Sequence, residues 1–110
     1  MTSQLNINAI DNSLIVSIPD EFDGYAVDKY RDTLHELVDT SCQQICLDFK
    51  NTLFIDSSGI GVIVFLFKRL RQESKQLHLI DVAGQPLKLM SMLHVDRTIS
   101  VNPVNLSAAL

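Results

Sequence analysis

The chain has 110 residues, the length of one ordinary domain, and we expect a single globular domain over residues 1–110. Its residues are 46% hydrophobic and 20% charged, a composition that gives no sign of disorder. The formal charge is -4, and the scattered Lys and Arg residues lack the basic stripe of a nucleic-acid-binding protein, so we expect no nucleic-acid partner.

Two segments of alternating apolar and polar residues open the chain, at 5–9 and 14–18, with a turn signal at Asp11-Asn12 between them. This pattern predicts an antiparallel hairpin that ends at Pro19. The first five residues lack the charged and apolar regions of a signal peptide, and we expect a cytoplasmic protein.

The hydrophobic period then changes from two residues to three and four. This spacing holds over residues 25–38 and predicts an amphipathic helix lying on a sheet, with Asp23 as its N-cap. Residues 45–49 predict a strand, which we expect to continue through residues 53–55 after a turn at residues 50–52.

The second half of the chain alternates helices and strands. Its predicted segments are a helix from Ser57 to about Glu73, a strand at 77–80, a helix at 85–93 with Pro86 in its first turn, a short strand at 98–101, and a helical turn or two at 104–110. This alternation after a hairpin predicts an α/β fold with a mixed, mostly parallel sheet and an antiparallel N-terminal edge.

The predicted helix after Ser57 has apolar residues on two sides. Those on one face are enough to cover a sheet: Ile60, Ile63, Val64, Phe67 and Leu70. Val62, Phe65 and part of Leu66 fall on the other side, which predicts a small exposed apolar patch for partner docking, unless a neighbouring element covers it. The longest apolar run of the chain, Ile60 to Phe67, is eight residues against about 20 for a bilayer span, so we expect no membrane insertion.

The two cysteines, Cys42 and Cys46, lie four residues apart, whereas redox and zinc pairs are usually separated by two residues. Cys46 falls in the apolar alternation of a predicted strand, and we expect it to be a reduced core thiol. The sequence therefore predicts no metal site and no cofactor.

The start of the same helix combines hydroxyls, a carboxylate and glycines. Ser57 and Ser58 stand beside Asp56, where side-chain oxygens can cap the unpaired N–H groups of a first helical turn. Gly59 and Gly61 each cost a helix about 1 kcal/mol relative to Ala. This cost favours a close approach of another backbone, or a turn that is modified or contacts a partner, over capping alone.

The residues at this junction do not match known catalytic motifs. A nucleophilic serine in a strand-to-helix turn needs G-x-S-x-G, but Ile55 and Asp56 stand two residues before Ser57 and Ser58. Paired catalytic carboxylates and a phosphate-binding glycine loop are also unsupported, so we expect no enzyme. One alternative stays open: Asp56 as the phosphoacceptor of a receiver-like domain, with Asp20-Glu21 imitating the acidic metal-binding pair, although no lysine stands in the expected place.

The motif Phe54-x-Asp56-Ser57-Ser58-Gly59-Ile60-Gly61 resembles that of the STAS domain of bacterial anti-sigma factor antagonists, and the likeness extends over nearly the whole chain. The resemblance implies helices packed mainly on one face of the sheet. It also implies that the unmodified protein binds a serine protein kinase that is an anti-sigma factor. Phosphorylation of Ser57 by this kinase would release it, and a serine phosphatase would reset the switch.

The resemblance and the helix pattern together give the expected partner-binding residues: Asp23, Asp56, Ser58, Gly59, Val62 and Phe65. Ser58 is also an alternative acceptor, and Asp56 either orients the incoming hydroxyl or caps the helix. The chain departs from the family pattern at Pro19-Asp20 and Phe22, next to Asp23. A rival role is that of a STAS accessory subunit of a lipid-transport ATPase, with the same helix as a static docking surface.

Overall fold

The computed structural model describes residues 5–103. Its elements in chain order are β1 (Asn6–Ile10), β2 (Ser13–Ser17), β3 (Glu21–Phe22), α1 (Gly24–Lys29), α2 (Arg31–Glu36), the 3-10 turn η1 (Leu37–Asp39), β4 (Gln44–Asp48), β5 (Phe54–Ile55), α3 (Ser57–Gln72), β6 (Gln76–Ile80), α4 (Gly84–Met92), the 3-10 turn η2 (Val95–Arg97) and β7 (Ser100–Val101).

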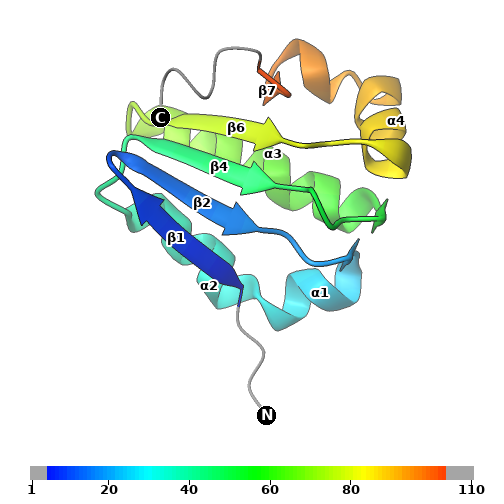
Figure 1. Cartoon of the computed structure of the whole chain (residues 1–110), viewed down its shortest axis with the longest axis horizontal. Helices are drawn as coiled ribbons and strands as arrows, with labels where there is room; N and C mark the ends of the chain where they lie inside the picture. Colours follow the sequence, from blue (N-terminus) through cyan, green and yellow to red (C-terminus); the bar gives the residue numbers. More distant parts are fainter. Residues whose placement is uncertain (1–4, 104–110) are drawn as a thin grey trace.

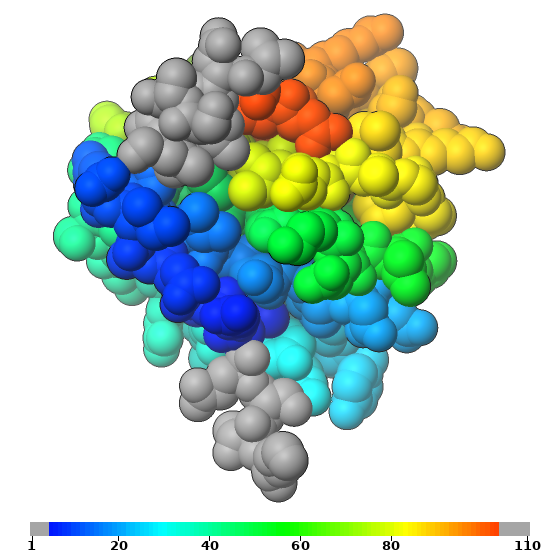
Figure 2. Space-filling view, in the orientation of Figure 1, coloured from blue at the N-terminus to red at the C-terminus, as the bar shows by residue number. Residues whose placement is uncertain are grey.

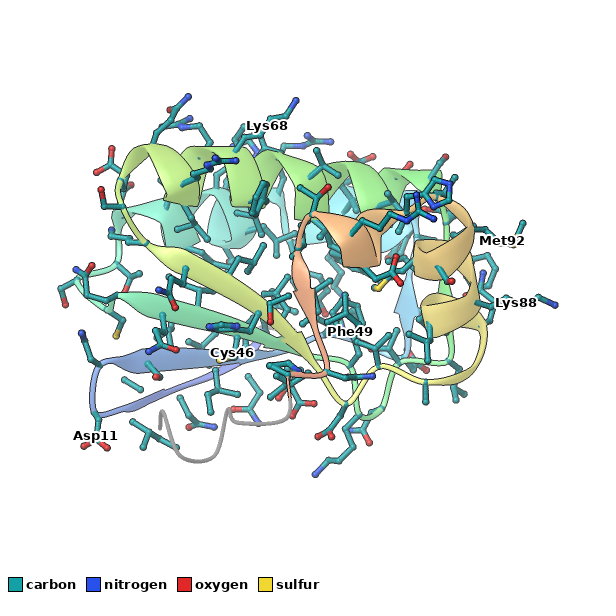
Figure 3. All side chains as sticks on the ribbon, turned by 90° about the horizontal axis from the view of Figure 1, so that it is seen from above. Asp11, Cys46, Phe49, Lys68, Lys88 and Met92 are labelled. Carbon is teal, nitrogen blue, oxygen red and sulfur yellow. The ribbon has the colours of Figure 1, made fainter. Side chains whose placement is uncertain are left out.

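The main sheet has five strands in the order β1-β2-β4-β6-β7. β1 runs antiparallel to β2, and every other neighbouring pair is parallel. Helices α1, α2 and α3 lie together on one face of this sheet (Figures 1 and 3). The predicted mixed sheet with an antiparallel N-terminal edge, and with helices mainly on one face, is confirmed.

The hydrophobic core lies between the sheet and these helices. Val16, Leu47 and Leu79 are neighbours in register across β2, β4 and β6, and none of the three is exposed to solvent. They share the core with Ile63 and other buried residues of α3. A fully buried side chain of this size contributes about 1.5–3 kcal/mol relative to an exposed one, so this layer fixes the position of α3 on the sheet.

The prediction of one continuous helix over residues 25–38 is wrong. The chain leaves helical geometry at Tyr30, with φ -106° and ψ 16°, which separates α1 from α2. Backbone hydrogen bonds continue across the break, from Tyr30 N–H to the Ala26 carbonyl and from Leu34 N–H to the Tyr30 carbonyl. Because Val27 and Leu34 both stay buried, the apolar period persists and gives no sign of the break.

Residues 53–55 do not continue the preceding strand. A turn closes after β4, with the Thr52 N–H donating to the Phe49 carbonyl and the Thr52 hydroxyl to the Ile18 carbonyl. The N–H groups of the next two residues then donate to the Asp20 carbonyl, which draws the chain out of the main sheet. β5 instead pairs in parallel with β3 in a separate two-stranded sheet, and the sequence did not predict β3.

The C-terminal part also differs in detail. The strand predicted at 98–101 is limited to β7, because residues 95–97 form η2 before it. β7 adds to the edge of β6, with Ser100 opposite His78. The helical turn predicted at 104–110 lies outside the described residues.

Candidate functional site

The starts of three helices gather at one edge of the sheet. Because β2, β4 and β6 are parallel, their carboxyl ends point to the same side, and the chain that follows each strand leads into α1, α3 and α4 there (Figure 1). Ligand and partner sites of open α/β sheets occur at this edge. The junction of β5 and α3 therefore lies where such a site is expected.

Asp56 joins two of these helix starts through its carboxylate. As N-cap of α3, its Oδ1 accepts hydrogen bonds from the N–H groups of Ser58 and Gly59, at 2.9 and 3.1 Å. Its Oδ2 accepts from the N–H of Gly24, the first residue of α1, at 3.2 Å. Of the two roles left open for Asp56, capping is the one that this geometry supports.

Three observations count against a receiver-like role for Asp56. Both carboxylate oxygens are already bonded to backbone N–H groups, and residues 5–103 contain no group of three His, Cys, Asp or Glu side chains that could hold a metal ion. The strand order also differs from the parallel 2-1-3-4-5 order of receiver-type folds, because here the first strand is an antiparallel end strand.

The two serines at the start of α3 differ in their surroundings. Both are exposed, but the Ser58 hydroxyl faces α1, where it would lie 3.4 Å from a Cβ placed on Gly24. Ser57 is the first residue of α3, and no hydrogen bond holds its side chain to another of the residues described. Its hydroxyl is therefore open to an approaching protein.

The predicted close approach of a backbone is confirmed at Gly59. A Cβ on Gly59 would lie 2.4 Å from the carbonyl oxygen of Phe22 and 2.7 Å from Cγ1 of Ile55, which no real side chain tolerates. Gly59 therefore lets α3 pack directly on β3. No such approach occurs at Gly61 within the described part of the chain, because a Cβ there would have no atom within 4 Å.

The third helix start is held to this junction by Gln85 of α4. The side-chain amide of Gln85 accepts from the Ile55 N–H and donates to the Ile55 carbonyl, both at 2.9 Å. It thus occupies the free edge of β5 as a further strand would. The sequence gives no local signal for this contact, since the two residues are 30 positions apart.

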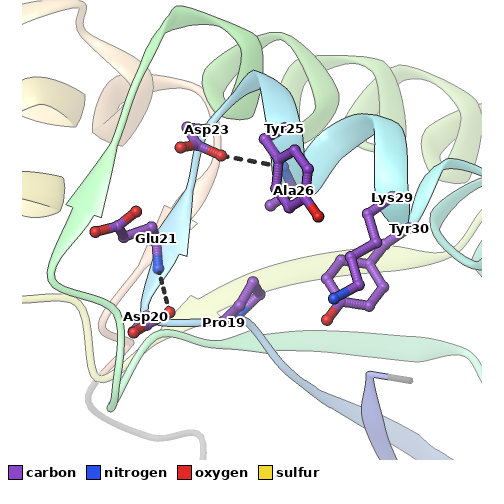
Figure 4. A pocket seen from close by; sticks show the side chains of 8 residues that line it. All are labelled: Pro19, Asp20, Glu21, Asp23, Tyr25, Ala26, Lys29 and Tyr30. Carbon is purple, nitrogen blue, oxygen red and sulfur yellow. Dashed lines mark hydrogen bonds between the residues drawn. The ribbon is translucent and has the colours of Figure 1, made fainter. Parts of the chain in front are cut away.

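An acidic pocket of about 200 Å³ lies beside Asp23 (Figure 4). It is lined by Pro19, Asp20, Glu21, Asp23, Tyr25, Ala26, Lys29 and Tyr30. Asp23 caps α1 as predicted, with Oδ1 accepting from the Ala26 N–H at 3.0 Å. The lining includes three carboxylates but a single ammonium, that of Lys29, which lies 5.4 Å from the centre of the Tyr30 ring. The pocket therefore favours a positively charged group.

The predicted apolar patch on α3 is largely covered. Leu66 is fully buried, so its assignment to the outer side is wrong, and Val62 and Phe65 are half-buried against the core. The ring of Phe65 stacks on His35 of α2 at 4.7 Å, and Arg69 lies 5.8 Å from the same ring. The helical wheel missed this because α3 packs against α2 as well as against the sheet.

Other apolar side chains are exposed at the helix-start edge. Tyr25 and Leu53 each keep 76% of their surface, and Phe54 keeps 43%. The Leu53 and Phe54 N–H groups bond to Asp20, and Tyr25 lines the acidic pocket, so all three surround the junction of β5 and α3. Residue pattern alone gave no reason to set them apart from core residues.

Cys46 and His78 lie next to each other in the main sheet. Both cysteines are free and buried, which for Cys46 confirms the prediction, and burial together with the charge of Asp48 raises the pKa of Cys46. Burial lowers the pKa of His78, whose Nδ1 lies 3.1 Å from the Ser100 hydroxyl oxygen. Within the described part of the chain, none of the helices is long and apolar enough to cross a membrane.

Comparison with known proteins extends over nearly the whole chain. A family model described as the STAS domain matches residues 4–108. The anti-sigma F factor antagonist of Paenibacillus polymyxa is 31% identical over 93 residues, which cover 84% of this chain and 80% of that protein. An anti-sigma-factor antagonist (STAS) domain protein from Planctomyces limnophilus superposes with a TM-score of 0.84 at 16% identity, covering 94% of this chain and 93% of that one. The Bacillus cell fate determinant SpoIIAA in its phosphorylated form superposes with a TM-score of 0.71 at 15% identity, covering 96% and 97%. These structures share the fold described above.

Proposed function

Because this chain belongs to the STAS domain family, we propose that it is an anti-sigma factor antagonist whose binding to a partner serine kinase is switched by phosphorylation of Ser57. The relatives named as anti-sigma factor antagonists are regulatory binding proteins, and the chain acts as the substrate of the kinase rather than as an enzyme. A serine phosphatase then restores the unmodified form. Phosphorylation and dephosphorylation take place in the cytoplasm, which supplies the ATP.

The observation that carries this proposal is the open hydroxyl of Ser57 at the first position of α3. Its neighbours already have structural roles, since Asp56 bonds three backbone N–H groups and Ser58 faces Gly24. A kinase can therefore reach Ser57 without breaking a contact of the fold. One solved structure of this fold is SpoIIAA in its phosphorylated form, which supports a modification of this kind.

A phosphate at Ser57 is expected to leave the fold intact. It adds about -1.5 to -2 charges, and the start of a helix stabilises a nearby negative charge by about 0.3–1 kcal/mol. The same charge joins an edge that already carries Asp20, Glu21, Asp23 and Asp56. Two like unit charges about 6 Å apart repel by about 3 kcal/mol at an effective dielectric near 20. A bound partner excludes the water that screens these charges of the chain from one another, and an added penalty of that size in the complex lowers affinity about a hundredfold.

The partner-binding residues fall into two groups. Asp23 lines the acidic pocket, where it offers its second carboxylate oxygen to a basic side chain of the kinase. Ser58 can donate a hydrogen bond beside it, whereas Asp56 and Gly59 act by holding the backbone of the turn in place. Val62 and Phe65, half-buried one to two turns along α3, take part through their exposed parts.

The test of this proposal compares three variants with the wild type. Purified protein is incubated with ATP and an extract of its own cells, and phosphorylated peptides are identified by mass spectrometry. We expect phosphate on Ser57 in the wild type and in the matched Ser58→Ala control, and none in Ser57→Ala. Ser57→Asp should keep the native circular dichroism spectrum and lose the kinase in a pull-down. Phosphate that persists in Ser57→Ala and disappears in Ser58→Ala would move the acceptor to Ser58.

The same pull-down separates the proposal from the transport alternative. Capture of a serine kinase by the wild type and not by Ser57→Asp supports the switch. Capture of a membrane permease and its ATPase, equally by both proteins, would instead support an accessory subunit of a lipid-transport ATPase.

A further inference from the structure

The end strand β1 leaves one long edge of the main sheet unpaired among the described residues. β1 bonds only to β2, and all five of its residues are exposed. It runs along one margin of the sheet, away from α4 and the start of α3 (Figures 1 and 2). β7, at the other end, has only two residues.

The hairpin register shows which backbone groups face outward. Ile10 and Ser13 are partners on either side of the two-residue turn at Asp11-Asn12, and such a pair exchanges hydrogen bonds. Hydrogen-bonded and non-hydrogen-bonded pairs alternate along an antiparallel ladder. Asn8 therefore bonds inward to β2, whereas the N–H and C=O groups of Ile7 and Ala9 point away from the sheet.

This edge lacks the usual protection against pairing. Natural edge strands are blunted by lysine, proline, bulges or inward charges. β1 reads Asn-Ile-Asn-Ala-Ile, with no charged residue and no proline, and it pairs with β2 without a bulge. Its two isoleucines, Ile7 and Ile10, are 36% and 48% exposed.

We propose that β1 pairs antiparallel with β1 of a second copy of this chain, about a two-fold axis through Asn8. In this register Ile7 exchanges two hydrogen bonds with Ala9 of the second copy, and Ala9 exchanges two with Ile7. Asn8 faces Asn8 in the non-hydrogen-bonded position. The two five-stranded sheets become continuous, and because β1 carries no charge, no like charges meet across the axis.

A second copy fits this edge better than an arbitrary partner, because the outward-facing residues lie symmetrically about Asn8 and place the small side chain of Ala9 opposite Ile7. Five residues per copy are few against about 20–30 a side for a standard interface, so the dimer is weak and depends on concentration. Ser57 stays accessible in both copies, and the dimer does not depend on the proposed switch.

Disulfide trapping tests both the interface and its register. Opposed residues in a non-hydrogen-bonded pair have Cα atoms about 4.5 Å apart, within the range of a disulfide. Asn8→Cys should therefore form a covalent dimer under mild oxidation, while the native cysteines are buried. The matched control is Asn6→Cys, equally exposed on the same strand, whose two Cα atoms would lie about 14 Å apart in this register. We expect at least tenfold slower cross-linking for the control.

Sedimentation of the unmodified chain provides the second measurement. The apparent molar mass of the wild type should rise toward twice the monomer value between micromolar and near-millimolar protein. Asn8→Lys places two ammonium groups opposite each other and should stay monomeric with an unchanged circular dichroism spectrum. Equal cross-linking of Asn6→Cys and Asn8→Cys, or a wild type that is monomeric throughout this range, would overturn the proposal without touching the role of Ser57.

Discussion

Two glycines of α3, separated by one residue, are expected to respond in opposite directions to the same substitution. Alanine at Gly61 meets nothing within 4 Å, so it only replaces a poor helix former by a good one. The free energy of unfolding should rise by about 1 kcal/mol. Alanine at Gly59 brings its Cβ to 2.4 Å from the Phe22 carbonyl oxygen, which belongs to the backbone of β3 and cannot rotate away.

The helix gains the same amount at Gly59, but the overlap outweighs it. Forcing an extra carbon into a packed site usually costs about 1–3 kcal/mol, and a contact this short with backbone lies at the upper end. Relief requires α3 and β3 to move apart, which weakens the pairing of β3 with β5. We expect Gly59→Ala to lower the free energy of unfolding by about 1–2 kcal/mol net.

Urea unfolding of the two variants, followed by circular dichroism, measures this difference directly. The midpoints should move in opposite directions with unchanged slopes, since the surface exposed on unfolding is the same. Each variant serves as the control for the other, because helix propensity contributes equally to both. If Gly59→Ala were as stable as Gly61→Ala, the close packing of α3 on β3 would be refuted.

Substitutions at three further residues test the contacts around the site and in the sheet. Asp56→Ala removes the acceptor for two N–H groups of α3 and for that of Gly24, and should lower the free energy of unfolding by about 2 kcal/mol, with a smaller loss for Asp56→Asn. Gln85→Glu loses its donor to the Ile55 carbonyl and brings two oxygens together, and urea unfolding should reveal a loss of about 1–3 kcal/mol, with no loss if the amide contact is absent in solution. Burial lowers the pKa of His78 in the folded protein below its ordinary value of 6.5, so as the pH falls the unfolded chain binds this proton before the folded chain does. The free energy of unfolding that is present above pH 6.5 is therefore lost as the pH falls toward the folded pKa. His78→Gln should reduce the slope of the free energy of unfolding against pH in this range. An equal slope in the wild type and the variant would contradict the prediction.

The sequence was sufficient wherever an element carried its own signal. The turn at Asp11-Asn12 between two alternating segments predicted the β1–β2 hairpin, and the polar cap at Asp56 followed by periodic apolar residues predicted α3. Capping by Asp23 was predicted for the same reason. In each case the residues that determine the structure are close neighbours in the chain.

Prediction failed where the determining contact is distant. A two-residue strand such as β3 or β5 is too short to show a period, and only its partner across the fold defines it. The bond from Gly24 to Asp56 spans 32 residues and that from Gln85 to Ile55 spans 30, so neither leaves a local pattern. These two contacts, absent from the sequence prediction, hold the candidate site to α1 and α4.

The exposed position of Tyr25, Leu53 and Phe54 at the helix-start edge has a consequence for how such proteins diverge. These side chains contribute little to the core, so they can be exchanged at small expense in stability, whereas Gly59 and Asp56 cannot. Related proteins can thus keep the turn at the start of α3 while the surface around it changes. In the function proposed above, the choice of partner would then rest on a few aromatic and aliphatic groups that the folding of the domain leaves free to vary.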